Sequence, residues 1–198
     1  MLRNTWNVFY SCCFCLTLGL APGALANTAD QPPVDAELRA LLMQAVSEAD
    51  SFADAFEAQV WLLDMSTRMR RYIPDEEERL RFLRLVHREA SRAELKPDLV
   101  LAVIHVESLF DRYALSRVGA QGIMQVMPFW KAELGRPEDN LIDLATNLRY
   151  GCTILKYYLD MEKGDLRRAL ARYNGSLGSH RYPDKVQDYW YRFWYVKD

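Results

Sequence analysis

The sequence carries almost no net charge. Its 198 residues include 25 lysines and arginines and 27 aspartates and glutamates, for a formal net charge of -2. It has no basic stripe and no lysine-rich tail, so neither nucleic acid nor an anionic lipid surface is predicted as a partner. Half of the residues are apolar and 12% are aromatic, which excludes a disordered composition and allows a folded core.

Cysteine is scarce beyond the first 26 residues. Arg3, the apolar stretch 8–20 and Ala24-Leu25-Ala26 together have the pattern of a secretory signal peptide (1–26), and cleavage after Ala26 is expected. Cys152 then remains alone, so no internal disulfide can form, and a buried, unreactive thiol is expected. The three cysteines inside the signal raise a lipoprotein anchor as an alternative, but the residues before them lack the lipoprotein cleavage pattern. We therefore expect export to the periplasm.

Glycine is absent from residues 27–118 and occurs seven times after them. Turns that need special backbone geometry are therefore expected in the second half of the chain. Residues 27–34 are predicted to be a flexible leader, 35–93 an N-terminal helical region and 94–198 a further helical domain. No β-hairpin is indicated, apart from a short irregular turn between Gly119 and Gly122. The predicted fold class is all-α.

Helix signals divide the first half of the chain. Apolar residues recur at helical spacing from Asp35 to Val46. A second helix is predicted from Ser51 and ends by Pro74. Its expected apolar stripe is Phe56, Val60 and Leu63. A third helix is predicted from Asp75, where acidic residues favour the positive end of the helix dipole. Its expected buried stripe is Leu80, Leu83, Val86 and Ala90.

A fourth helix is predicted to be the centre of the fold. Pro97 suits its first position, and residues 99–106 are apolar almost all round, which is typical of a helix buried on every side. Farther along, Asp143 and Asp165 are predicted helix caps, and Asn174-Gly175 is a predicted helix stop. Pro183 is predicted to open a last, aromatic-rich helix. Its aromatic residues are expected to pack on the N-terminal helices, with stacking on sugar rings as the alternative.

Glu107 is the residue with the strongest indication of chemistry. It ends the apolar helix, with Val103, Ile104 and Phe110 at neighbouring helical positions. Loss of hydration there would raise the pKa of the carboxyl group and keep its proton available for donation near neutral pH. The alternative is an ordinary helix-terminal carboxylate that reaches solvent or pairs with Arg112.

A second catalytic carboxylate is not evident. The candidates are Asp111, Glu133, Asp139 and Asp143. Of these, we interpret Asp111 as a structural helix-end residue and Asp143 as a helix cap. The three histidines, at 87, 105 and 180, have no metal-ligand spacing, so neither a metal nor a cofactor is expected. A conventional glycosidase would require two such carboxylates.

Ordered sequence blocks follow Glu107. They are residues 107–111 (ESLFD), 114–116 (ALS), 119–128 (GAQGIMQVMP), Asn147 with Gly151, and 171–175 (ARYNG). In order, spacing and identity they resemble the catalytic domain of the soluble lytic transglycosylases (family 1), of the goose-type lysozyme class. The resemblance covers residues 95–186. It departs from the family after Asn174, where the chain continues Gly-Ser-Leu-Gly.

The resemblance implies roles for residues at matching positions. Glu107 would be the catalytic acid and base, and Ser108 would orient the substrate or the carboxyl group. Met124 and Gln125 would line the sugar groove, and Tyr173 and Asn174 would lie beside the carboxyl, with the tyrosine hydroxyl bonded to Glu107. Taken alone, Met124 favours a core position and Ser108 a hydroxyl bonded to the backbone. Asn147 and Gly151 indicate close helix packing.

The resemblance also implies a lysozyme-like fold and a reaction. The enzyme would cleave the β-1,4 bond between N-acetylmuramic acid and N-acetylglucosamine in peptidoglycan without water, forming 1,6-anhydro ends. Rival interpretations are a goose-type muramidase that uses water and a non-catalytic peptidoglycan-binding or scaffold protein. The N-terminal helices 35–93 have no chemistry of their own and either wrap the catalytic domain or meet a cell-wall or secretion-machinery protein.

Overall fold

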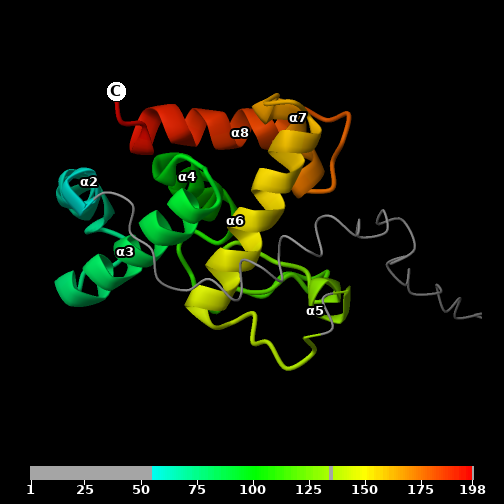
Figure 1. Ribbon diagram of the computed structural model, residues 1–198, viewed down its shortest axis with the longest axis horizontal. Coiled ribbons are helices and arrows are strands. Elements are labelled where there is room, and N and C mark those ends of the chain that lie inside the picture. Colours follow the sequence, from blue (N-terminus) through cyan, green and yellow to red (C-terminus); the bar gives the residue numbers. More distant parts are fainter. Residues whose placement is uncertain (1–54, 134–135, 198) are drawn as a thin grey trace, which may run out of the picture. The chain divides into compact units, whose positions relative to one another are not determined.

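The computed structural model describes residues 55–133 and 136–197, all within one compact unit (Figure 1). The described residues form helices, turns and two isolated β-bridges at Gln121, so the all-α prediction is confirmed for this part of the chain. The predicted helix in 35–46 and the predicted start at Ser51 lie outside it. The helices are α2 (Ala55–Met69), α3 (Glu76–Arg92), α4 (Pro97–Glu107), α5 (Phe129–Glu133), α6 (Leu144–Met161), α7 (Leu166–Tyr173), α8 (Arg181–Tyr189) and the π-helical segment η2 (Trp190–Trp194).

The predicted apolar stripe of α2 is wrong at Leu63, whose side chain is 76% exposed. Met65 and Met69, one helical turn apart, are instead fully buried. Residues 61–63 are three consecutive apolar residues, so the sequence pattern alone did not determine which side of the helix faces the core. The side chains of Phe56 and Val60 lie outside the described set.

Helix α3 begins as predicted. The carboxylate of Asp75 accepts a hydrogen bond of 2.7 Å from the backbone N–H of Glu78, and three glutamates occupy the first turn. Three of the four predicted stripe residues are buried, and Leu80 is partly buried. Phe82, Arg79 and Glu89 are buried as well, so α3 presents a wider face to the core than the stripe indicated.

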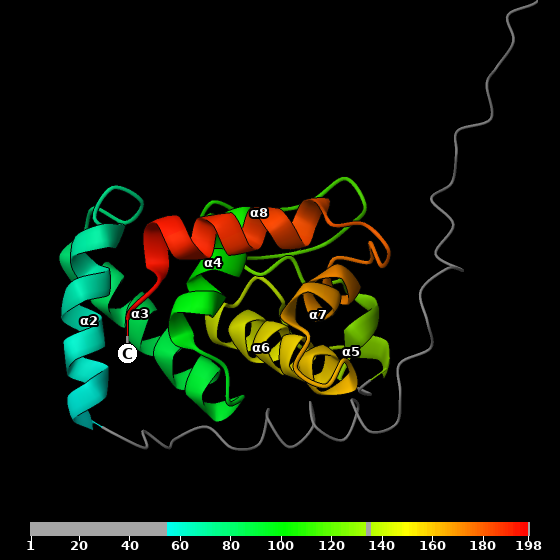
Figure 2. The same cartoon turned by 90° about the horizontal axis from the view of Figure 1, so that it is seen from above.

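Helix α4 is the buried centre of the fold. Pro97 lies in its first turn, and every residue from Asp98 to His105 is buried. It packs against α3 on one side and against α8 and η2 on another, with α8 crossing above α4 in Figure 2. Because α4 is held from several sides, its carboxyl end is a rigid support for Glu107.

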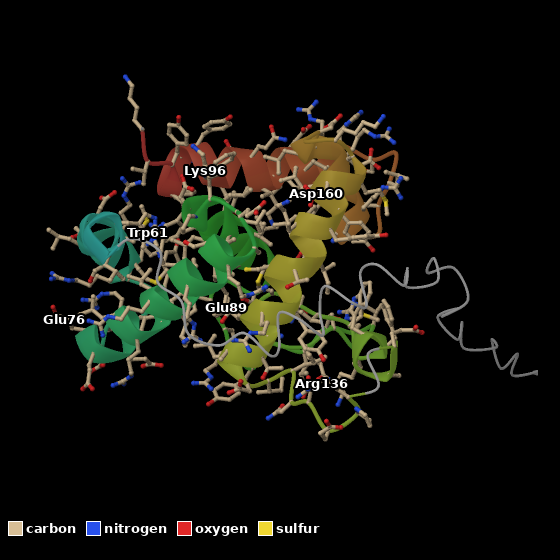
Figure 3. The ribbon with its side chains drawn as sticks, viewed as in Figure 1. Trp61, Glu76, Glu89, Lys96, Arg136 and Asp160 are labelled. Atoms are coloured by element: carbon tan, nitrogen blue, oxygen red, sulfur yellow. The ribbon has the colours of Figure 1, made fainter. Side chains whose placement is uncertain are left out.

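A buried ionic cluster joins α3 to α6. Glu89 is fully buried, with Arg149 Nη2 at 3.1 Å and Arg92 Nε at 3.0 Å from its carboxylate oxygens (Figure 3). Burial alone would raise the pKa of Glu89, but hydrogen bonds and charge from Arg149 and Arg92 lower it below its ordinary value. No pattern in the sequence indicated this cluster.

The C-terminal half follows its predicted caps. Asp143 accepts from the N–H of Thr146 and caps α6, and Asp165 caps α7 through Arg168. Asn174 ends α7, and Gly175 follows with φ of +69°, in the left-handed conformation that glycine adopts without strain. The last helix begins at Arg181, two residues before the predicted Pro183.

The C-terminal aromatic run packs mainly on α4 and to a smaller extent on α2, so the expected packing on the N-terminal helices is found in part. Trp194 is 1% exposed, and its ring lies 5.4 Å from that of Phe110 and 6.1 Å from that of Tyr72. Arg68 of α2 donates hydrogen bonds to the carbonyls of Phe193 and Tyr195. The exposed rings of this run are Tyr191 and Tyr195.

Candidate active site

Glu107 is the last residue of α4, and its carboxyl group is largely shielded from solvent. Tyr182, the second residue of α8, donates a hydrogen bond of 2.5 Å from its hydroxyl to Glu107 Oε1. Burial raises the pKa of Glu107 to about 7, against smaller lowering effects from the Tyr182 hydrogen bond and the charge of Lys185. The carboxyl group is therefore partly protonated at neutral pH, the condition under which it both donates and accepts a proton.

The alternative of an ion pair with Arg112 is not realised. No salt bridge joins Arg112 to a carboxylate among the described residues. Its guanidinium lies instead over the Tyr113 ring, 5.1 Å from the centroid. Glu107 therefore remains without a compensating cation in direct contact, which leaves desolvation as the dominant influence on its pKa.

Tyr173 does not hold the Glu107 carboxyl by a hydrogen bond, contrary to the sequence-based expectation. Its hydroxyl donates to the backbone carbonyl of Met124 at 2.8 Å. It is nevertheless close, since burial first and the charge of Glu107 second raise the pKa of the Tyr173 hydroxyl. The tyrosine that bonds Glu107 is Tyr182, which the sequence analysis missed because it lies outside the Tyr-Asn block and 75 residues from Glu107.

Ser108 ties the end of α4 to the glycine-containing loop. Its hydroxyl lies 2.8 Å from the carbonyl oxygen of Ile123 and 3.3 Å from that of Ile104. The Ser108 hydroxyl therefore donates to the backbone and not to the Glu107 carboxyl group. This is the alternative interpretation given above for Ser108. The backbone then turns sharply, because Leu109 and Phe110 have φ of 54° and 67°. Two consecutive non-glycine residues in the left-handed region carry strain, which is common beside functional sites.

Asn147 organises the glycine-containing loop to which Ser108 is bonded. Its amide accepts from the N–H of Met124 at 2.8 Å and donates to the carbonyls of Gln121 at 2.8 Å and Leu141 at 2.7 Å. A Cβ at Gly122 would lie 2.4 Å from the Asn147 amide nitrogen, so the close approach requires glycine. The close packing predicted at Asn147 and Gly151 is present, but the partner of α6 there is this loop and not another helix, and Asn147 adds three hydrogen bonds.

The remaining predicted site residues differ in what they offer a ligand. The Met124 side chain is fully buried against Gly151, where a Cβ would lie 2.5 Å from its sulfur, so it presents no surface to a sugar. Gln125 is partly exposed and donates its amide to the carbonyls of Ala114 and Gly122. Asn174 is exposed at the end of α7.

Three of the four other candidate carboxylates, those of Asp111, Asp139 and Asp143, have partners other than Glu107. Asp111 accepts from the N–H of Tyr113 in a local turn, and Asp143 caps α6. Asp139 pairs with Arg136 and accepts from the Tyr150 hydroxyl.

Within the described ranges, no group of three histidine, cysteine, aspartate or glutamate side chains is arranged to hold a metal ion. The described helices include none with the length and apolarity to cross a membrane.

The family of the chain follows from comparison with known proteins. Residues 84–191, more than half of the chain, match the family model described as the transglycosylase SLT domain. The chain therefore belongs to the SLT transglycosylase family. The matched segment contains Glu107, Tyr182, Asn147 and the glycine-containing loop.

Curated relatives include the membrane-bound lytic murein transglycosylases C of Yersinia pestis (strain Pestoides F) and Yersinia pseudotuberculosis serotype O:1b. Each is 31% identical over 115 residues, covering 50% of this chain and 32% of the relative. This chain thus matches about a third of the length of those relatives. Among solved structures, an inactive mutant of the lytic transglycosylase Slt from Pseudomonas aeruginosa is 24% identical, with a TM-score of 0.43, covering 78% of this chain and 26% of that one.

Proposed function

We propose that this protein is a peptidoglycan lytic transglycosylase in which Glu107 performs both proton transfers. The observation that carries the proposal is the setting of Glu107, a shielded carboxyl whose pKa is raised to about 7 at the end of a rigid helix. Family membership and relatives named lytic murein transglycosylases support the same reaction.

The proposed reaction begins with Glu107 as the acid. Its proton passes to the oxygen that joins N-acetylmuramic acid to N-acetylglucosamine, and the bond from that oxygen to C1 breaks. The acetamido group of the substrate stabilises the cation at C1. Glu107, now a carboxylate, removes the proton from the C6 hydroxyl of the same muramic acid, and that oxygen bonds to C1. The products are a 1,6-anhydro end and a free N-acetylglucosamine end, and Glu107 regains its proton.

Neighbouring groups support these two roles in different ways. The Tyr182 hydroxyl donates to Glu107 Oε1 and stabilises the carboxylate that forms after the first proton transfer. Asn174 is exposed and Gln125 is partly exposed, and we propose both as sugar contacts. Ser108 and Tyr173 act through the backbone of the loop, and Met124 supports it from the core.

The test is mass spectrometry of the products released from purified sacculi. We expect muropeptides with anhydro ends from the wild type and none from Glu107→Gln, while Glu138→Gln, which changes an exposed carboxylate, matches the wild type. Products heavier by one water would favour the muramidase. Equal release by Glu107→Gln and the wild type would contradict the acid–base assignment, and no release by the wild type would favour the scaffold protein.

We also propose that residues 1–26 direct export to the periplasm and that 94–198 form the catalytic domain, with the helices of 35–93 beside it or meeting a partner protein. The pattern of the first 26 residues supports export, and relatives described as membrane-bound lie in the cell envelope. N-terminal sequencing of the protein recovered from the periplasm should begin at Asn27. An unprocessed N-terminus would contradict cleavage after Ala26.

A further inference from the structure

A pocket lies beside the turns that follow Glu107 and is lined by Phe110 and Arg112. It has a volume of about 480 Å³ and is lined by residues of α3 and of the start of α6. Its apolar lining includes the buried side chains of Phe82, Phe110 and Ile123. Neither Glu107 nor Tyr182 lines it, so it is separate from the candidate active site. Its size lies within the usual range of small-molecule and peptide pockets.

Arg112 supplies this pocket with a cation that forms no salt bridge among the described residues. The side chain lines the pocket, and its Nε is shielded from solvent without a hydrogen-bond partner among the described residues. A shielded guanidinium nitrogen without an acceptor costs free energy, because it loses water without gaining a replacement. A carboxylate is the group that best satisfies such a donor, since the planar guanidinium binds it through two parallel hydrogen bonds.

The other charged groups at the pocket have a pattern that matches a small zwitterion. Arg81 pairs with Glu77, and the carboxylate of Asp143 caps α6. The carboxylate of Glu78 has no partner among the described residues and is exposed at the rim. The pocket therefore has one cation and one anion without a salt bridge among the described residues, together with an apolar floor, which suits a short peptide with a carboxylate, an ammonium group and aliphatic carbons.

We propose that this pocket binds a carboxylate-bearing peptide, namely the stem peptide attached to the muramic acid of the substrate, with a peptide carboxylate on Arg112. The proposal rests on the proposed function for the identity of the substrate. Arg112 follows Glu107 by five residues and lies in the second of the two turns after α4. The Ser108 hydroxyl bonds the carbonyl of Ile123, which links the end of α4 to the pocket floor. A peptide bound in this pocket would thus help to position the glycan to which it is attached at Glu107.

The binding test uses the full chain and a fluorescein-labelled stem tetrapeptide, followed by fluorescence polarisation. Arg112→Ala should weaken binding about tenfold, the usual effect of losing one charge-assisted hydrogen bond. Arg117→Ala, an exposed arginine on the same loop that does not line the pocket, is the matched control and should bind like the wild type. Ala145→Trp fills the pocket without changing charge and should also weaken binding.

Three results would overturn the proposal. They are no binding of the tetrapeptide, equal binding by the wild type and Arg112→Ala, and displacement of the probe by peptide-free glycan, which would make the pocket a sugar site. Because binding is measured without turnover, the catalytically blocked Glu107→Gln variant should bind like the wild type. A loss of the proposed catalytic activity therefore cannot be mistaken for a loss of peptide binding at the pocket.

The activity test compares two substrates with the same glycan. One is peptide-bearing glycan from sacculi, and the other is the same glycan after an amidase has removed the peptides. Arg112→Ala should lower the rate of anhydro-product release about tenfold on the first and leave the second unchanged. Equal loss on both substrates, or loss on neither, would contradict the proposed peptide site.

Discussion

The raised pKa of Glu107 makes a quantitative prediction about stability. Its carboxyl has an ordinary pKa of 4.5 in the unfolded chain and about 7 in the folded protein. Well below pH 4.5 Glu107 is therefore neutral in both states, and its burial does not lower the free energy of unfolding. As pH rises from 4.5 to 7 the unfolded chain releases its proton first, so stability is lost across this window and levels off above pH 7. At about 1.4 kcal/mol per pKa unit, the total loss is about 3 kcal/mol.

Glu107→Gln removes this titration while keeping an oxygen that accepts from Tyr182. The free energy of unfolding should be nearly equal for the wild type and the variant at pH 4.5. At pH 8 the variant should be more stable by about 3 kcal/mol.

Urea denaturation of both proteins at half-unit pH steps measures the difference, and all other titrating groups cancel in the subtraction. A flat difference across pH 4.5–7, or a wild type that gains on the variant with rising pH, would refute the desolvated environment assigned to this carboxyl.

Three further predictions follow from contacts around the site. Tyr182→Phe removes a hydrogen bond that lowers the pKa of Glu107, so the alkaline limb of the pH–rate profile should move to higher pH; an unmoved limb would contradict the contact. Leu109 is 63% exposed with φ of 54°, so Leu109→Gly should be more stable than Leu109→Ala by about 1 kcal/mol in thermal unfolding, the reverse of the order in helices. Asn147→Ala should destabilise the fold by about 3 kcal/mol in urea, since it leaves the buried N–H of Met124 and two carbonyls without their partners. A loss below about 1 kcal/mol would show that the loop does not depend on this amide.

Features set by local sequence were predictable. The caps at Asp75, Asp143 and Asp165 each depend on a side chain and a backbone N–H three residues later, so the sequence shows both partners together. The burial of α4 was predictable for a similar reason, because a stretch that is apolar at every position from 99 to 106 except His105 leaves no polar face to expose.

Contacts between distant segments were not predictable in the same way. The bond from Tyr182 to Glu107 depends on how α8 crosses α4, and nothing near Tyr182 in the sequence marks it. The cluster around Glu89 likewise depends on the packing of α3 against α6, and its residues resemble an ordinary solvated face when read along the chain. The block resemblance placed Tyr173 in the right region but could not tell whether its hydroxyl faced the carboxyl or the loop backbone.

The position of Trp194 shows that the segment matching the family model is shorter than the segment that forms the hydrophobic core. The family match ends at residue 191, yet Trp194 is 1% exposed and packs on Phe110 and on His105, to which it donates a hydrogen bond of 3.1 Å. The match begins at residue 84, which would divide α3 and leave out Phe82. A fragment cut at the family boundaries would lack core on both sides of α4. Protein production guided by homology alone would therefore yield a chain that contains every proposed catalytic group and lacks part of the core that holds them in place.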